Sequence, residues 1–151
     1  MTDAVVTLRV SYGTNAATES ASQTGIVFCA ADALSGADVA PGTVSYERWV
    51  RLALDTANSH SITALSFTAH PVLPTGVTIK YGVTDTPATP VNTASTIATH
   101  TLDSDHVIWD TNTYDANSDR SRYLVLQMAV ASDATSGPIT QNGLTFGWTQ
   151  S

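Results

Sequence analysis

Short runs in which apolar and polar residues alternate constrain the fold of this chain more than any other feature. In VTIKYGV (77–83), Val, Ile and Tyr occupy one parity, and Thr, Lys and Gly occupy the other. The run AVVTLRVSY (4–12) has the same period of two. Successive side chains of a β-strand point to opposite faces, so each run predicts a strand with one buried face.

Similar runs follow one another at the spacing that is typical of sandwiches and barrels. We predict strands over residues 4–12, 24–30, 45–55, 60–70, 77–83, 93–102, 105–110, 121–132 and 144–150. Gly, Pro and small polar residues separate them, and no segment carries a clear helical period. The expected fold is therefore all-β: an antiparallel β-sandwich of jelly-roll type with about eight or nine strands.

The length of 151 residues fits one domain, which can bury a core without disulfide or metal staples. Residues 1–25 combine a strand-like start with a loop of small polar residues, so they are a candidate for an extended N-terminal strand or arm. Residues 26–151 are expected to form the single sandwich domain. Within it, residues 121–132 are apolar at both parities, which predicts a central strand.

Charge excludes two classes of partner. Only 13% of the residues are charged, and the net charge is −7. Binding to nucleic acid needs clustered Lys and Arg, whereas the six basic residues of this chain form no run. An acidic protein is also repelled by anionic membranes. We therefore expect no nucleic acid and no membrane among the partners.

The N-terminal residues MTDAVVTLRVSYG (1–13) have neither a basic region nor a long apolar region. This predicts that the chain carries no secretory signal peptide. No window reaches the roughly 18 apolar residues of a membrane span. Cys29 lies in the apolar run GIVFCAADAL (25–34), which favours a small buried side chain over a reactive thiol.

No set of residues has the spacing of a metal site. The four histidines, which are His60, His70, His100 and His106, are not at ligand spacing. The segment DTNTYDANSD (110–119) is rich in oxygen ligands, but Asp115 and Ser121 stand where a calcium loop needs Gly and Glu. We expect neither a metal nor a cofactor, with an irregular calcium site in this loop left open as an alternative.

Catalytic motifs are likewise lacking. Most acidic residues lie in turns, where Asp is expected for conformational reasons. Glu47 beside Trp49 could pair an acid with a sugar platform, but the plainer interpretation is an exposed carboxylate near Arg48 or Arg51. The chain has no nucleophile elbow, phosphate loop or dinucleotide fingerprint. We therefore predict no catalytic residue and no enzyme.

The aromatic residues divide into candidates for the core and candidates for the surface. Phe146 and Trp148 share a parity with Leu144, which predicts core positions, and Trp109 lies in an apolar run. Trp49 and Tyr114 remain as exposed aromatics that could stack on a sugar. Carbohydrate binding through these two residues is therefore an alternative function.

The segment SYERWVRLALD (45–55) concentrates basic and aromatic residues in a chain that is poor in both. Trp, Tyr and Arg are the residue types that anchor protein interfaces. We predict partner contacts for Arg48, Trp49, Arg51 and Tyr114. The alternative that Trp49 packs under a loop of its own chain remains open.

Two segments carry a resemblance to a known class of proteins: SYERWVRLAL (45–54) and ITALSFTAHPVLPTGVTIKYGVTDTPATP (62–90). The sequence resembles small virion structural proteins of tailed bacteriophages, in which a SYE-x-W-x-R strand precedes a TGVTIKYG strand and a proline-broken ATP loop. The likeness covers roughly residues 44–90 and the closing apolar strands. It implies a β-sandwich decoration, or cement, protein on the outer capsid surface.

The resemblance also implies partners and a location. The partner would be the major capsid protein, and the protein itself would be a homo-oligomer, often a trimer. It would be made in the host cytoplasm, and residues 1–25 could join neighbouring chains by β-augmentation. Two alternatives stay open: a tail or neck component of the virion, and a carbohydrate-binding or adhesin module.

Overall fold

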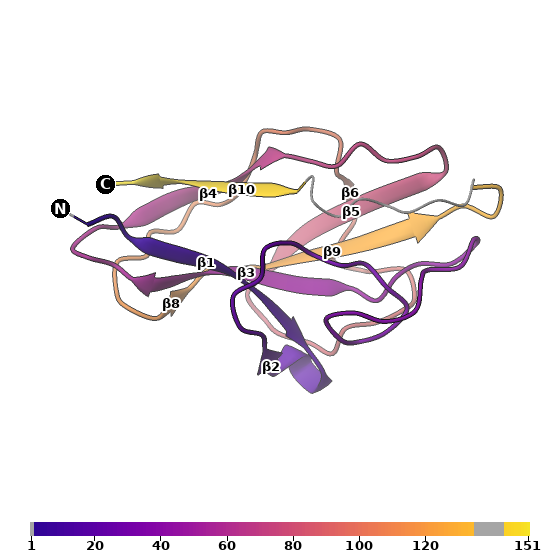
Figure 1. Cartoon of the computed structure of the whole chain (residues 1–151), viewed down its shortest axis with the longest axis horizontal. Coiled ribbons are helices and arrows are strands. Elements are labelled where there is room, and N and C mark those ends of the chain that lie inside the picture. The colour runs from indigo at the N-terminus through magenta and orange to yellow at the C-terminus, as the bar shows by residue number, and fades with distance from the viewer. Residues whose placement is uncertain (1, 135–143) are drawn as a thin grey trace.

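The computed structural model describes residues 2–134 and 144–151. Its strands form two antiparallel sheets that face each other (Figure 1). The all-β sandwich predicted from the alternating runs is thereby confirmed, with ten strands in the described residues.

The larger sheet has the strand order β2-β1-β3-β9-β5-β6, and β8 also pairs with β3. Its strands are β1 (Val5–Tyr12), β2 (Thr18–Glu19), β3 (Arg48–Thr56), β5 (Val77–Thr84), β6 (His100–Thr101), β8 (Asp119–Arg120) and β9 (Tyr123–Val130). The smaller sheet has the order β10-β4-β7 and is formed by β4 (Ile62–Ala69), β7 (Val107–Asp110) and β10 (Thr145–Gln150). A jelly roll has eight strands in two Greek keys; the division of seven against three supports the sandwich without adding support for that topology.

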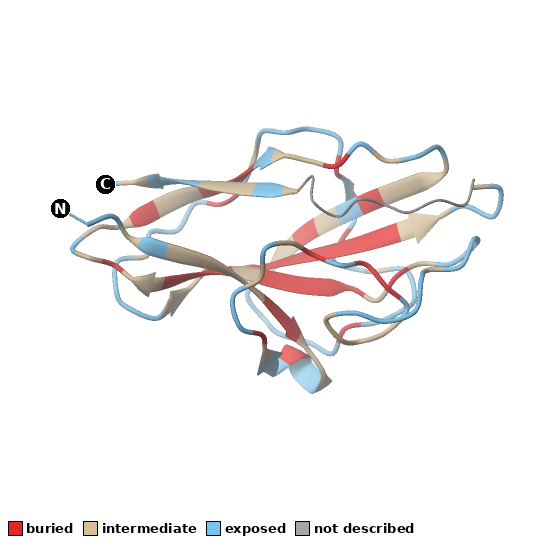
Figure 2. Cartoon of the chain, in the orientation of Figure 1, coloured by how far each residue is buried: buried red, intermediate tan, exposed pale blue. Residues whose placement is uncertain are grey.

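The centre of the larger sheet is buried on both faces. The strand β9 lies between β3 and β5, as its apolar sequence predicts, and Leu124, Val125 and Leu126 are fully buried. Both β3 and β9 are mostly red in Figure 2, whereas the loops at the ends of the sandwich are largely pale blue. Two separate clusters of buried residues, one on each face, account for this pattern.

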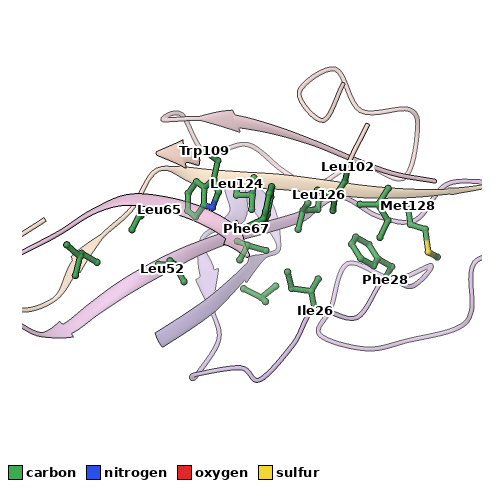
Figure 3. Packing of buried hydrophobic residues seen from close by; sticks show 14 of the residues in the cluster. Ile26, Phe28, Leu52, Leu65, Phe67, Leu102, Trp109, Leu124, Leu126 and Met128 are labelled. Carbon is green, nitrogen blue, oxygen red and sulfur yellow. The ribbon is translucent and has the colours of Figure 1, made fainter. Parts of the chain in front are cut away.

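The main cluster fills the space between the sheets (Figure 3). The side chains that the figure labels are Ile26, Phe28, Leu52, Leu65, Phe67, Leu102, Trp109, Leu124, Leu126 and Met128. Phe67 is fully buried, and its ring centroid lies 5.5 Å from that of Tyr81 and 5.7 Å from that of Phe146. The contact with Tyr81 joins the smaller sheet to the larger one, whereas the contact with Phe146 joins β4 to its neighbour β10.

The second cluster covers the outer face of the larger sheet around Trp49. It contains Ala16, Trp49, Ala98, Tyr123 and Val125. Ala16 comes from the short 3-10 helix η1 (Thr14–Ala16), and Ala98 comes from the loop before β6. The apolar residues on this face are therefore buried by the chain's own connections.

Gly82 allows that loop to lie directly on the sheet. A Cβ atom at this position would be 1.9 Å from the carbonyl oxygen of Ile97, far below any allowed contact. The obstacle is backbone, so it cannot be relieved by turning a side chain. The glycine in the predicted strand 77–83 thus marks the place where a second segment contacts the backbone of β5.

Two predicted strands are absent or shortened. Residues 26–29 are not a strand, although Ile26 and Phe28 are buried as expected. The carbonyls of Val27 and Ala31 accept hydrogen bonds from the Arg48 side chain instead of from a neighbouring strand. Of the predicted strand 93–102, only His100–Thr101 forms one, as β6.

The N-terminal strand is part of the larger sheet. From Val5 to Ser11, β1 pairs with β3 in the larger sheet, and Ser11 and Tyr12 pair with β2. Gln23 then forms a bridge with Leu8. The N-terminal strand predicted over residues 4–12 is thus present as β1 and is built into the larger sheet, while the division of the chain at residue 25 stays a prediction.

Replacement of Gly82 by Ala should destabilise the protein by about 1–3 kcal/mol, the usual cost of overpacking a filled site. The Cβ atom must push the backbone of Ile97 away from β5. Urea unfolding followed by circular dichroism measures the loss. The variant Thr96→Ala alters an exposed residue of the same loop and should change stability by no more than about 0.5 kcal/mol. Equal stability of Gly82→Ala and the wild type would contradict the close contact.

Candidate functional site

Three arginines from separate strands lie together on the outer face of the larger sheet. Arg9 on β1 is directly opposite Arg51 on β3, and Arg120 on β8 is opposite Ala53 on β3. Directly paired residues of an antiparallel sheet point to the same face. We call Arg9, Arg51 and Arg120, with the carboxylates of Glu19 and Asp55, the arginine patch.

Each arginine of the patch contacts a carboxylate, and two of the three share one. Arg9 Nη2 lies 3.1 Å from Asp55 Oδ1, and the hydroxyl of Thr7 donates to Asp55 Oδ2 at 2.6 Å. Glu19 lies between the other two arginines, 3.0 Å from Arg51 Nη2 and 3.0 Å from Arg120 Nε. Like charges opposite each other destabilise a sheet, so these carboxylates are needed to hold the cations together.

An aromatic pair, Tyr123 and Trp49, packs against the arginine patch. The guanidinium carbon of Arg51 lies 4.5 Å from the ring centroid of Tyr123, within the range of a cation–π interaction. The ring of Tyr123 packs edge-on against Trp49 with a centroid distance of 5.4 Å. Arg51 is therefore fixed from one side by Glu19 and from the other by an aromatic ring that rests on a buried tryptophan.

Arg48 does not contribute to this surface. Arg48 is 1% exposed. Because side chains alternate along β3, its side chain points to the opposite face of the sheet from those of Trp49 and Arg51. Its Nε donates to the carbonyl of Val27 at 2.6 Å, and its Nη2 donates to the carbonyl of Ala31 at 3.0 Å and contacts Cys29 Sγ. Burial lowers the pKa of the Arg48 guanidinium, while the thiol of Cys29 and the carboxylate of Asp32 act in the opposite direction.

The prediction that Arg48 forms a partner contact is therefore wrong for this chain. Arg48 instead holds the irregular segment 27–31 against the sheet. A buried guanidinium without its hydrogen-bond partners would be costly, so the carbonyls of this segment and the arginine depend on each other.

Trp49 is fully buried, so it offers no contact surface and no sugar platform. It packs beneath segments of its own chain, which was the alternative interpretation. Its indole Nε1 donates to Glu47 at 3.3 Å. Among the residues predicted on β3, only Arg51 reaches the surface.

Buried polar groups beside Trp49 fasten the loop that covers it. Glu47 is 3% exposed; Oε1 accepts a hydrogen bond from the backbone N–H of Val91 at 3.1 Å, and Oε2 accepts one from the hydroxyl of Ser95. Gln127 accepts from the N–H of Ser95 at 2.8 Å and donates to the carbonyl of Thr93 at 2.7 Å. Glu47 is thus neither an exposed carboxylate nor an acid in a cleft; it anchors a loop.

Tyr114 lies away from the arginine patch, next to the smaller sheet. Its backbone bridges Ile62, and its hydroxyl donates to Asp110 Oδ2 at 2.7 Å. Burial, and then the hydrogen bond to Asp110, raise the pKa of Tyr114 to about 12. The prediction that Tyr114 contacts a partner remains a prediction, since its side chain is only half-buried.

Two aspartates of the candidate calcium loop, Asp110 and Asp119, accept hydrogen bonds from groups in or next to the loop. Asp110 accepts hydrogen bonds from the backbone N–H groups of Asn112 and Arg122 as well as from Tyr114. Asp119 accepts from the N–H groups of Asp115 and Ala116. Across residues 2–134 and 144–151, no three His, Cys, Asp or Glu side chains gather in a way that could hold a metal ion.

Sequence reasoning missed Glu19 and Arg120 as surface residues. They are separated by 101 positions, and only the pairing of β8 with β3 brings them together. The alternation in residues 4–12 and 45–55 does place Arg9 and Arg51 at polar parities. The strand pairing that unites these two residues is not encoded in either run alone.

Comparison of the chain with protein-family models, with curated proteins and with solved structures gave no match. Within the part of the chain that the structure describes, no helix has the length and apolar character needed to cross a membrane.

Replacement of Glu19 by Gln should destabilise the protein by about 1 kcal/mol, the upper end for partly exposed ion pairs, because one carboxylate serves two arginines. The loss should shrink in 1 M salt, where the Debye length falls to about 3 Å. Urea unfolding at low and high salt measures both values. The matched control Asp103→Asn, in an exposed loop, should be nearly neutral. An equal loss at both salt concentrations would argue against an electrostatic role of Glu19.

Tyr114 should show its transition near pH 12 in a spectrophotometric titration. Its pKa is higher in the folded chain than the value of about 10 expected when unfolded, so its contribution to stability is complete below pH 10 and is lost as pH rises toward 12. Absorbance at alkaline pH follows the ionisation. Tyr114→Phe should lack the step near pH 12 and Tyr12→Phe should retain it; a step that survives in Tyr114→Phe belongs to another residue.

Proposed function

We propose that this protein is a bacteriophage virion structural protein, of the capsid decoration type, that binds the major capsid protein and stabilises the outer head lattice. The resemblance of residues 44–90 to small phage virion proteins suggests the class. The observation that carries the proposal is the arginine patch, a rigid cationic surface on an otherwise acidic chain. A homotrimer on the outer capsid surface is part of the same proposal.

The construction of the patch supports a role in binding. Its arginines project from three paired strands, which position side chains more accurately than loops do. Arg51 is held between Glu19 and the ring of Tyr123, so little side-chain entropy remains to be lost when a partner binds. Arginines that are fixed in this way are typical anchors of protein interfaces.

The distribution of charge supports an acidic partner surface. The patch combines three arginines with two carboxylates and so carries a net charge of about +1, while the whole chain has a net charge of −7. This difference would orient the protein, with the patch toward an acidic shell and the acidic loops toward solvent.

The buried polar residues support a structural role for the sandwich. Glu47 and Gln127 bind loop backbone, Arg48 binds the carbonyls of residues 27–31, and Asp110 fixes the turn after β7. Each of these groups holds a connection against a sheet. Such a molecule keeps its surface in one arrangement, which is what repeated binding on a regular lattice requires.

Binding to capsids tests the proposal. Purified protein, mixed with expanded capsids that lack it, should co-sediment up to a saturating number of copies, and its presence should raise the temperature at which the capsids disrupt. The double variant Arg51→Ala/Arg120→Ala should bind at least about tenfold more weakly, as expected when interface anchors are lost. Raising the salt concentration should weaken wild-type binding.

The control is Arg122→Ala, which removes an arginine that is ion-paired with Asp85 outside the patch. This variant should bind as the wild type does. Circular dichroism establishes that each variant is folded. Binding without saturation, or equal binding of the double variant, would overturn the proposed role of the patch. Preference for isolated tails over heads would favour the alternative of a tail or neck component.

A further inference from the structure

A cleft of about 250 Å³ opens between the two sheets at the edge formed by β1 and β10. It is lined by Val6, Thr7, Leu8, Gln23, Thr24, Leu52, Leu144, Thr145, Phe146 and Trp148. The arginine patch, by contrast, occupies the outer face of the larger sheet. The cleft is therefore a second feature of the surface, distinct from the proposed contact with the capsid.

Trp148 distinguishes this cleft from the rest of the sandwich. Its parity with Phe146 predicts a core position, and Phe146 indeed packs against the main cluster. Trp148, however, is 39% exposed, whereas Trp49 is 0% and Trp109 is 5% exposed. The prediction of a core position is thus wrong for Trp148.

The reason lies in the position of Trp148 at the open edge. The strand β10 pairs with β4 on one side only, and its register shifts between Gly147 and Thr149. A Cβ at Gly147 would lie 2.5 Å from Thr68 Cγ2, so the methyl group of Thr68 occupies the space beside Gly147. The indole one residue further on lines the mouth of the cleft and is left half-covered.

The chemistry of the lining limits the ligand. None of the ten lining residues is charged, although 13% of the chain is. The polar members are Gln23 and three threonines. The hydroxyl of Thr7 donates to Asp55 at 2.6 Å, whereas Thr24 and Thr145 are exposed and, with the amide of Gln23, supply polar groups on both sides of the cleft. Such a lining disfavours an ion and suits a neutral molecule that has both an apolar face and hydroxyl groups.

We propose that this cleft binds a neutral saccharide, with one sugar ring stacked on the indole of Trp148. A pyranose ring offers a face of C–H groups to the indole and hydroxyls to Gln23, Thr24 and Thr145. An aromatic ring that is already half-exposed and flanked by neutral polar groups provides these two contacts. The inference is independent of the proposed capsid contact, because its residues lie in the cleft and not in the arginine patch.

The size of the cleft favours one sugar ring over a long ligand. Its volume of about 250 Å³ lies just below the range of about 300–1,000 Å³ that is usual for drug-sized ligands. The backbone N–H of Gln23 bonds to the carbonyl of Leu8 at 2.9 Å, which occupies part of the edge of β1 that an added peptide strand would need. A terminal ring of a glycan fits this arrangement better than an extended peptide.

Screening of the full chain against an array of neutral and acidic oligosaccharides tests the proposal. We expect binding to a set of neutral glycans that share one terminal sugar, with quenching of tryptophan fluorescence on titration with the methyl glycoside of that sugar. Trp148→Ala should weaken the affinity by at least about tenfold, as loss of a central aromatic anchor does. Trp148→Tyr should retain part of the binding.

Two further variants complete the design. Gln23→Ala changes a half-buried residue on the opposite wall of the cleft and should also weaken binding. The matched control is Ile108→Ala on β7, the other edge strand of the smaller sheet, whose side chain is likewise exposed; it should bind as the wild type does. Thermal unfolding establishes that all variants are folded.

The outcomes separate cleanly. Absence of binding to every neutral glycan would overturn the proposal, as would binding that survives Trp148→Ala. Binding restricted to acidic glycans and lost in Arg51→Ala would assign recognition to the arginine patch instead. Capture of an extended peptide in the cleft, with no glycan bound, would replace the saccharide by strand addition. The capsid-binding test rests on Arg51 and Arg120 and not on the cleft, so failure of the Trp148 site leaves the capsid-binding result unchanged.

Discussion

The burial of β3 and β9 on both faces is the constraint on which the rest of the structure depends. A sandwich of two sheets buries one face of each sheet, but here Trp49, Tyr123 and Val125 form an apolar group on the outer face as well. That group would be exposed unless the chain covered it. The 3-10 helix η1 and the loop before β6 supply the cover, and Gly82 leaves room for the loop to lie against β5. The positions of η1 and of the loop before β6 are therefore explained by the need to bury this apolar group.

The same constraint explains why the buried polar residues lie where they do. A loop laid on a sheet brings backbone N–H and carbonyl groups out of water, and each needs a partner. Glu47 and Gln127 satisfy several of them for residues 91–95, and Arg48 does so for residues 27–31 on the other face. In a chain with few charged residues, an acid, an amide and an arginine thus replace the hydrogen bonds that further strands would have given.

Period-two alternation predicted the long strands well because each buries a face through its own sequence. β1, β3, β4, β5 and β9 all lie where alternating or apolar runs predicted them. The run around Ile26 and Phe28 is predicted as a strand because burial is visible in its composition. In the structure, however, the carbonyls of Val27 and Ala31 accept hydrogen bonds from the Arg48 side chain, 21 and 17 positions along the chain. Trp49 is expected at the surface but is buried, and Trp148 is expected in the core but is exposed. Parity assigns a side chain to one face of a strand, whereas the segments that cover that face come from distant parts of the chain. The union of Glu19 with Arg51 and Arg120 likewise depends on strand order, which single runs do not contain.

The outcome is a sandwich whose surfaces differ in chemistry: an arginine patch on the outer face of the larger sheet, and a neutral cleft with an exposed tryptophan at the β1–β10 edge. We propose that the arginine patch is the face that contacts the capsid. An electron cryo-microscopy reconstruction of the protein on its particle tests this most directly. Our account predicts density for the sandwich on the head, with Arg9, Arg51 and Arg120 turned toward the shell. Density on the head with these arginines facing solvent, or density on the tail alone, would contradict it.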